Sequence, residues 1–245
     1  MQLLVVGSGE MGRWFARQSG AEAVAFADRD LVTAREAAAT LDPARAVPID
    51  TDETFDVVCL AVPMSATPSA IETHAGKATE AVLDVAGEMR DSVAALETHA
   101  ESRGLACASV HPLFSAANAP GNVPIVVVRD GRPIERLRSA LESAGNDVFE
   151  TPAEDHDRAM ETVQAKAHTA VLAYALAAEE VDPRFHTALS EPLSELVSSL
   201  TGDTPAVYAE IQTRFDGSAS VAEAAAEIAD ADAETFLELY EEAGE

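Results

Sequence analysis

The first half of the chain alternates short apolar runs with amphipathic segments. Residues 3–7 (LLVVG) and 56–63 (DVVCLAVP) are continuous apolar runs, which is typical of strands that are buried on both faces. A helical pattern over residues 10–19 follows the first run, and residues 23–28 (AVAFAD) form the next strand candidate. Because strands that alternate with helices pair in parallel through right-handed crossovers, we predict a doubly wound α/β sheet.

The same alternation continues to about residue 128. Helical patterns are expected over residues 30–40 and 91–103. The remaining strand candidates are residues 46–50 (AVPID), 81–87 (AVLDVAG), 105–110 (LACASV) and 124–128 (PIVVV).

The pattern changes near residue 150. From residue 154 onward the chain carries long alanine-rich helical patterns, in which Leu193, Leu196, Val197 and Leu200 recur at helical spacing. Phe236, Leu239 and Tyr240 form a further apolar stripe, which favours a core or a subunit interface. We therefore expect two domains, residues 1–150 with the sheet and residues 151–245 entirely helical, and a homodimer formed through the helical part.

Charge narrows the range of partners. There are 43 acidic and 16 basic residues, a formal net charge of -27. Such a surface repels nucleic acid and anionic membranes, so we expect neither as a partner. The acids are spread over the whole chain, which favours a solvated surface suited to a very salty cytoplasm, as in haloarchaea, over an acidic patch for a basic partner.

Other bulk features predict a cytoplasmic protein without a metal. No apolar run reaches the ~18 residues that a membrane span requires, and the chain enters its first apolar run at Leu3 without a basic leader. Cys59 and Cys107 lie inside apolar segments. They have neither the spacing of metal ligands nor the density of a disulfide framework.

A glycine motif follows the first strand candidate. Gly7, Ser8, Gly9, Glu10, Met11 and Gly12 form the pattern GxGxxG at the start of a helix. In a dinucleotide site the first glycine allows the tight turn, the second lets the backbone approach a pyrophosphate, and the third lets helix and strand pack closely. The helix start offers free N–H groups to phosphates. A glycine turn that serves only the topology remains the alternative.

Asp28 makes the motif specific for a dinucleotide. It ends the second strand 21 residues after Gly7, where a carboxylate binds the ribose hydroxyls of a Rossmann-type site. A carboxylate repels a 2′-phosphate, which favours NAD over NADP, although the following Arg29 could pair with that phosphate. Ala61, Val62 and Pro63 end another strand candidate and are expected beside the nicotinamide end of the cofactor.

His111 is the candidate for acid–base chemistry. It follows residues 105–110 and so lies just beyond the carboxyl end of a predicted strand, where open α/β sheets bind ligands. A histidine there can accept a proton at neutral pH. A hydrogen-bonded His-Pro turn without a catalytic role is the alternative that the position leaves open.

Several motifs occur together in one order. HPLF at residues 111–114 is followed by PIVVVRDG, EDHDRAM, VQAKAH, LSEPLSEL and YAEI. In order and spacing the chain resembles the prephenate dehydrogenase family from the glycine motif to about Arg214. The resemblance implies a Rossmann domain joined to a helical dimerisation domain, and NAD-dependent oxidative decarboxylation of prephenate in tyrosine biosynthesis.

The same resemblance implies roles for individual residues. His111 would hydrogen-bond the 4-hydroxyl of the substrate and withdraw its proton. Gln164 and His168, four residues apart and so on one helical face, would line the substrate cleft. A place on the helix surface or the dimer face is their alternative. Arg214 is the candidate cation for a substrate carboxylate.

Three positions depart from the family pattern. The family commonly has a serine and a lysine where this chain has Gly87 and Met89, and an arginine where it has Glu195. A glutamate cannot replace the bidentate cation that holds a carboxylate. The helical part offers the cations Arg158, Lys166, Arg184 and Arg214 instead.

These departures keep other functions open. Arogenate carries an amine, which an acidic Glu195 tolerates better than a second carboxylate. A β-hydroxyacid or imine dehydrogenase is a further alternative, because Lys166 stands on the first long helix of the second part, where the β-hydroxyacid enzymes need a lysine. A non-catalytic NAD-responsive binding protein would also be compatible with Gly87, Met89 and Glu195.

Overall fold

The computed structural model describes residues 1–202 and 204–244. The chain divides into two compact units, Met1–Asp157 and Arg158–Glu245. The division falls within helix α6 (Ala153–Met160), later in the chain than residue 150. The beginning of α6 therefore belongs to the first unit, together with His156 and Asp157.

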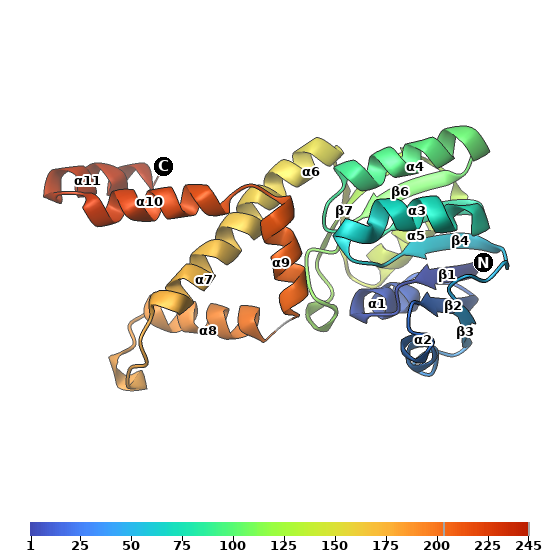
Figure 1. Ribbon diagram of the computed structural model, residues 1–245, viewed down its shortest axis with the longest axis horizontal. Coiled ribbons are helices and arrows are strands. Elements are labelled where there is room, and N and C mark those ends of the chain that lie inside the picture. Colours follow the sequence, from blue (N-terminus) through green and yellow to red (C-terminus); the bar gives the residue numbers. More distant parts are fainter. Residues whose placement is uncertain (203, 245) are drawn as a thin grey trace. The chain divides into compact units, whose positions relative to one another are not determined.

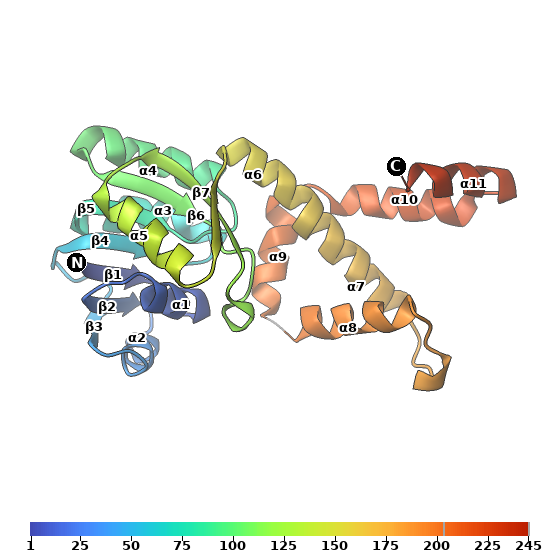
Figure 2. The ribbon, with the colours of Figure 1, turned by 180° about the vertical axis from the view of Figure 1, so that it is seen from behind.

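The first unit is built on one sheet of eight strands (Figures 1 and 2). The strands are β1 (Gln2–Val6), β2 (Ala23–Asp28), β3 (Ala44–Pro48), β4 (Phe55–Leu60), β5 (Ala78–Asp84), β6 (Ala106–Val110), β7 (Asn122–Arg129) and β8 (Asp147–Glu150). Their order is β3-β2-β1-β4-β5-β6-β7-β8. The order reverses beside β1, which confirms the predicted doubly wound α/β fold.

Helices cover both faces of this sheet. They are α1 (Glu10–Gln18), α2 (Leu31–Ala38), α3 (Thr67–His74), α4 (Arg90–Arg103) and α5 (Arg132–Ser143). Trp14 of α1 and Leu137 of α5 belong to the apolar core on one face, with Phe26 of β2. Ile71 of α3 and Leu96 of α4 belong to the core on the other face. The alternating side chains of the buried strands supply both cores, as their continuous apolar sequence predicts.

One strand pair runs against the expected parallel pairing. β6 and β7 are antiparallel, with Ser109 opposite Val126, while the other neighbouring strands pair in parallel. The connection, residues 111–121, is fully described and contains only a 3-10 turn, Ala116–Asn118. A parallel return needs a longer crossover, usually a helix, so this short connection produces a hairpin-like return. The strand β8 and the helix α5 were not expected from the sequence pattern.

The second unit is helical throughout its described residues. It contains a π-helical segment (Glu161–Lys166), α7 (Ala167–Ala177), a 3-10 turn (Pro183–Phe185), α8 (Ser190–Thr201), α9 (Pro205–Arg214), α10 (Ser218–Asp230) and α11 (Ala233–Glu242). Side chains link four of these elements. Gln212 donates from Nε2 to the Ala165 carbonyl (3.0 Å), and the Thr169 hydroxyl donates to Gln212 Oε1 (2.9 Å). The Ser218 hydroxyl also hydrogen-bonds Gln212 Oε1.

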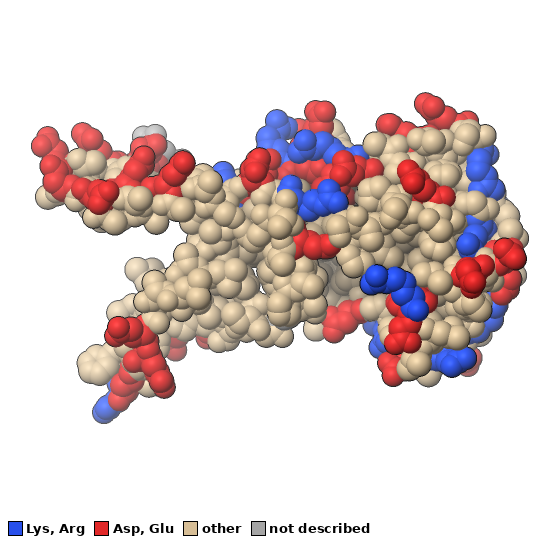
Figure 3. Space-filling view, in the orientation of Figure 1, with Lys and Arg blue, Asp and Glu red and all other residues tan. Residues whose placement is uncertain are grey.

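This unit leaves much apolar surface uncovered. None of the residues described in α7, α8, α10 and α11 is buried. Leu176 is 89% exposed, Leu189 80% and Tyr240 71%. Figure 3 shows uncharged surface over α7 and acidic side chains along α10 and α11, where residues 216–245 carry ten acids and no basic residue. No helix in the described part of the chain is long and apolar enough to cross a membrane.

Candidate functional site

The loop after β1 depends on two glycines for the chain's own packing. Gly7 has φ +95°, and a Cβ there would lie 2.2 Å from the Ala61 carbonyl oxygen. A Cβ at Gly12 would lie 2.1 Å from the Gly7 carbonyl oxygen. Both contacts are far shorter than van der Waals distance, so a side chain at either position would force the surrounding backbone to shift. Gly7 lets the loop turn beneath Ala61, and Gly12 lets α1 pack against the loop.

Gly9 has a different environment. It precedes α1 in extended conformation, and no described atom lies within 4 Å of the position that a Cβ would take. No side chain caps the start of α1. The loop thus leaves open space beside the first N–H groups of a helix that carries a partial positive charge at this end, which is the arrangement that binds phosphates. Glu10 and Met11 form the first turn of this helix.

Asp28 lies at the end of β2 and is hydrogen-bonded to this loop. Its carboxylate accepts from the backbone N–H of Ser8 (2.8 Å) and of Asp30 (3.1 Å). Arg29 is exposed. The structure therefore brings together the glycine loop and Asp28, although the sequence pattern alone does not show the bond to Ser8.

Residues 61–63 complete this part of the site. The N–H of Ala61 donates to the Val6 carbonyl (2.7 Å), which extends the pairing of β1 and β4 beyond their last strand residues. Val62 is half-buried and Pro63 is exposed. The carboxyl ends of β1, β2 and β4 thus form one edge, as expected for parallel strands.

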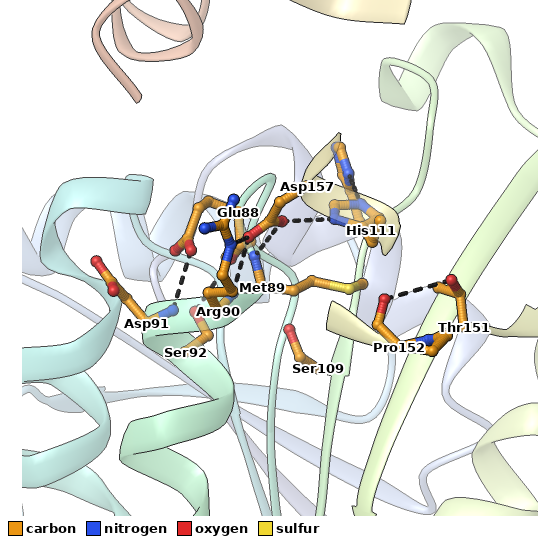
Figure 4. A network of polar contacts seen from close by, with 12 residues as sticks. Glu88, Met89, Arg90, Asp91, Ser92, Ser109, His111, Thr151, Pro152 and Asp157 are labelled. Carbon is orange, nitrogen blue, oxygen red and sulfur yellow. Dashed lines mark hydrogen bonds and ion pairs between the residues drawn. The ribbon is translucent and has the colours of Figure 1, made fainter. Parts of the chain in front are cut away.

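His111 directly follows β6 at the same edge of the sheet. Its ring is buried, and its Nδ1 lies 2.9 Å from Nε2 of His156. Nδ1 of His156 lies 2.8 Å from Oδ1 of Asp157. The Asp157 carboxylate also accepts from the N–H groups of Met89 (3.0 Å) and Arg90 (3.1 Å) at the start of α4 (Figure 4). The residue after β6, two residues of α6 and the start of α4 are therefore joined by one continuous series of hydrogen bonds.

The charge of Asp157 sets the direction of these hydrogen bonds. Burial raises the pKa of Asp157, but hydrogen bonds from His156 and from the Met89 and Arg90 amides outweigh burial and lower it to about 2. An ionised carboxylate only accepts, so Nδ1 of His156 carries a proton, and in the neutral form of His156 its Nε2 is an acceptor. Nδ1 of His111 must then donate, which leaves Nε2 of His111 with a free lone pair.

His111 is neutral at physiological pH. Burial, together with the neighbouring His156, lowers the pKa of His111 to about 3. A Cβ on Gly87 would lie 3.5 Å from Nε2 of His111 and 2.7 Å from Sδ of Met64. The accepting end of His111 therefore lies beside Gly87. A neutral imidazole with a bare nitrogen can accept a proton from a substrate.

Two further acids are buried near His111. Burial raises the pKa of Asp84 to about 7, and the Ser109 hydroxyl donates to its Oδ1 (3.0 Å). Burial and the charge of Asp157 raise the pKa of Glu88 to about 7. Sequence reasoning assigned no role to Asp84, Glu88, His156 or Asp157. The motif EDHDRAM contains the last two, and this adjacent His-Asp pair is the signal that could have indicated them.

The remaining predicted residues lie in the second unit. Gln164 is in the π-helical segment, which no sequence pattern indicated, and Arg214 ends α9. The His168 ring packs edge-on against Tyr208, with centroids 4.9 Å apart, and burial lowers its pKa. Oε1 of Gln164 and Nδ1 of His168 are buried without a hydrogen-bond partner among the described residues. Glu195 is exposed on α8.

No family model matches the chain. The 4-amino-4-deoxyprephenate dehydrogenase of Streptomyces pristinaespiralis is 30% identical over 208 residues, which cover 76% of this chain and 69% of that protein. The T-protein of Haemophilus influenzae is 32% identical over 164 residues, 64% of this chain and 42% of the T-protein.

Solved structures show the same fold. The prephenate dehydrogenase of Aquifex aeolicus, in complex with hydroxyphenyl propionate and NAD+, matches with a TM-score of 0.66 at 17% identity, over 91% of this chain and 86% of that chain. The arogenate dehydrogenase of Synechocystis matches with a TM-score of 0.59 at 20% identity, over 94% and 90% of the two chains.

Proposed function

The chain belongs to the prephenate/arogenate dehydrogenase family, and from this premise we propose that it is an NAD-dependent dehydrogenase that oxidises and decarboxylates prephenate. The observation that carries the proposal is the neutral His111, whose Nδ1 is engaged by His156 and whose Nε2 is free to accept. This base follows β6 at the sheet edge where the glycine loop follows β1. Open α/β sheets bind their ligands at this edge.

The residues of the glycine loop are suited to a dinucleotide. The open space beside Gly9 and the uncapped start of α1 would receive the pyrophosphate. The Asp28 carboxylate would accept hydrogen bonds from the ribose hydroxyls and repel a 2′-phosphate, which supports NAD over NADP. Ala61, Val62 and Pro63 would line the nicotinamide end. When bound, the nicotinamide supplies the hydride acceptor.

The proposed reaction needs one base. His111 accepts the proton of the substrate 4-hydroxyl at Nε2 while the same ring carbon loses its hydride and becomes a carbonyl carbon. The ring carboxylate then leaves as carbon dioxide, and its bonding electrons enter the ring, which becomes aromatic on taking a proton at the carbonyl oxygen. Base assistance of this kind contributes about 10²- to 10⁴-fold. In the second unit, Gln164, His168 and Arg214 are the proposed substrate contacts.

The relative that acts on 4-amino-4-deoxyprephenate supports a second substrate candidate. Nε2 of His111 can accept from a neutral amine as well as from a hydroxyl. Gly87 has no side chain, so this position brings no hydroxyl donor to the nitrogen that would select for oxygen. A substrate with a 4-amino group, or arogenate with its side-chain amine, is therefore the alternative to prephenate.

Steady-state assays in molar salt test these substrates directly. Prephenate, arogenate and 4-amino-4-deoxyprephenate are each offered with NAD and with NADP. We expect the highest kcat/KM for prephenate with NAD. A preference for an amino substrate would replace prephenate in the proposal. No turnover of any of the three, with nucleotide binding retained, would favour a non-catalytic NAD-responsive protein.

His111→Asn tests the base. We expect turnover to fall about 10²- to 10⁴-fold while the affinity for NAD, measured by calorimetry, is unchanged. The matched control is His99→Asn, a half-buried histidine of α4 outside the hydrogen-bond chain, which should leave both quantities unchanged. Unchanged turnover in His111→Asn would remove this residue from the mechanism.

We also propose that the helical second domain pairs with its copy in a homodimer. The uncovered apolar side chains of α7, α8 and α11 support this, because surface of this kind marks subunit interfaces. Sedimentation in molar salt should give twice the mass of 25.7 kDa, and a monomer would contradict the proposal. The net charge of -27 further supports a salty cytoplasm as the working environment.

A further inference from the structure

We propose that His156 and Asp157 are positioning residues that hold His111 in the tautomer with a bare Nε2 and stabilise its protonated form. The inference rests on the proposed function in treating His111 as the base. The contacts that carry it are His111 Nδ1 to His156 Nε2 (2.9 Å) and His156 Nδ1 to Asp157 Oδ1 (2.8 Å).

Asp157 determines the direction in which the hydrogen bonds of this series are donated. Its carboxylate is held by the Met89 and Arg90 N–H groups and by the Arg90 guanidinium, and it is 1% exposed. Because these donors keep it ionised, His156 donates to it from Nδ1, and Nε2 of a neutral His156 then accepts from His111. A neutral histidine carries one ring proton, so Nε2 of His111 is fixed as the acceptor. The tautomer of His111 is thus determined by the Asp157 carboxylate, to which it is connected through His156.

The same two residues stabilise His111 after it has accepted a proton. A buried imidazolium is unfavourable, and burial is the main reason why the pKa of His111 is low. The negative charge of Asp157 acts in the opposite direction and raises this pKa. On protonation the bond from His111 Nδ1 to His156 becomes charge-assisted and therefore stronger. His156, paired directly with Asp157, can share the positive charge.

A purely structural role is the competing explanation. Asp157 also stabilises the start of α4 by accepting from its first N–H groups, as an N-terminal acid does. His156 is 3% exposed and could simply fill space. A substitution of His156 distinguishes the structural role from the positioning role, because it leaves the hydrogen bonds between Asp157 and the start of α4 in place.

The tautomer is measured by ¹⁵N NMR of the histidine rings in the wild-type protein without substrate. We expect His111 and His156 both to be protonated at Nδ1 and bare at Nε2. A proton on Nε2 of His111 would overturn the inference. This measurement needs no turnover, so it decides the inference even if the proposed substrate is wrong.

Three variants then distinguish the effect of the hydrogen-bond acceptor at His156 from that of the negative charge at Asp157. His156→Phe keeps an aromatic ring but removes the acceptor, and kcat should fall at least about 10-fold, toward the ~10⁴-fold seen when a triad histidine has the wrong tautomer. His156→Gln restores an acceptor and should recover the His111 tautomer and part of kcat. Asp157→Asn keeps the shape and removes the charge, and it should lower kcat with little change in KM.

Calorimetric affinity for NAD should be unchanged in all three variants, and His99→Phe is the matched control. A folded His156→Phe protein with kcat within about twofold of wild type would overturn the inference. If nucleotide binding itself is absent from the wild type, the proposed function fails, while the NMR result for His111 still stands or falls separately.

Discussion

We expect the free energy of unfolding of Asp84→Asn, minus that of wild type, to increase as the pH rises. Asp84 ends β5 and is 0% exposed. Its Oδ1 accepts from the Ala86 N–H (3.0 Å) and the Ser109 hydroxyl (3.0 Å), and its Oδ2 has no hydrogen-bond partner within the described chain. An ionised carboxylate is therefore poorly solvated there, which raises its pKa to about 7.

The magnitude follows from the linkage between proton binding and folding. The ordinary pKa of 3.8 and the folded-state value of about 7 differ by an amount worth about 4 kcal/mol, at about 1.36 kcal/mol for each pKa unit. The folded state binds the proton more tightly, so this stabilisation is complete below about pH 4 and is lost as the pH rises to about 7. Asparagine does not titrate, so Asp84→Asn does not lose this stabilisation as the pH rises.

Chemical denaturation of both proteins at a series of pH values measures the effect. Between about pH 5 and pH 8, the free energy of unfolding of Asp84→Asn minus that of wild type should rise by about 2.5 kcal/mol. His111 also titrates abnormally, but it is present in both proteins, and its contribution cancels in the difference. The charge of Glu88 raises the pKa of Asp84 too, so comparing the same two proteins in a Glu88→Gln background isolates the effect of burial. A difference that is constant or that falls with pH would refute the reasoning that burial dominates the electrostatics of Asp84.

Three further predictions concern the glycine loop and Asp28. Gly9→Ala should leave the Tm of the free protein unchanged and weaken NAD binding at least about 10-fold in calorimetry, because its Cβ meets only the ligand space; equal affinity would contradict this. Gly12→Ala should lower the free energy of unfolding by about 1–3 kcal/mol, since its Cβ would lie 2.1 Å from the Gly7 carbonyl oxygen, and an unchanged denaturation midpoint would count against it. Asp28→Ala should reduce the ratio of kcat/KM for NAD over NADP about 10-fold; a constant ratio would exclude Asp28 as the selective group.

The fold of the first unit could be predicted because its signals are local. The apolar runs of β1 and β4 and the glycine pattern between β1 and α1 each lie within a few residues. The orientation of β7 could not be predicted, because an apolar run reads the same in either direction. The orientation depends on the short connection at residues 111–121, whose length becomes meaningful only when both strands are known.

In the candidate site, local sequence signals indicate where a residue lies but not what it contacts. His111 is predicted from its place after a strand, whereas its contact with His156 joins residues 45 positions apart, and no periodicity indicates such a contact. The π-helical segment that contains Gln164 also has no local signal. Its cost is compensated by long-range partners such as Gln212, which hydrogen-bonds the Ala165 carbonyl.

The antiparallel return of β7 determines how firmly the proposed base is held. The N–H of His111 donates to the Pro124 carbonyl (3.0 Å), and that of Leu113 donates to the Asn122 carbonyl (2.9 Å), so the β6–β7 ladder continues past the end of β6. A histidine in a free loop would lose conformational entropy each time it met its substrate. His111 has already lost that freedom when the chain folds, and its ring is aligned before any substrate arrives.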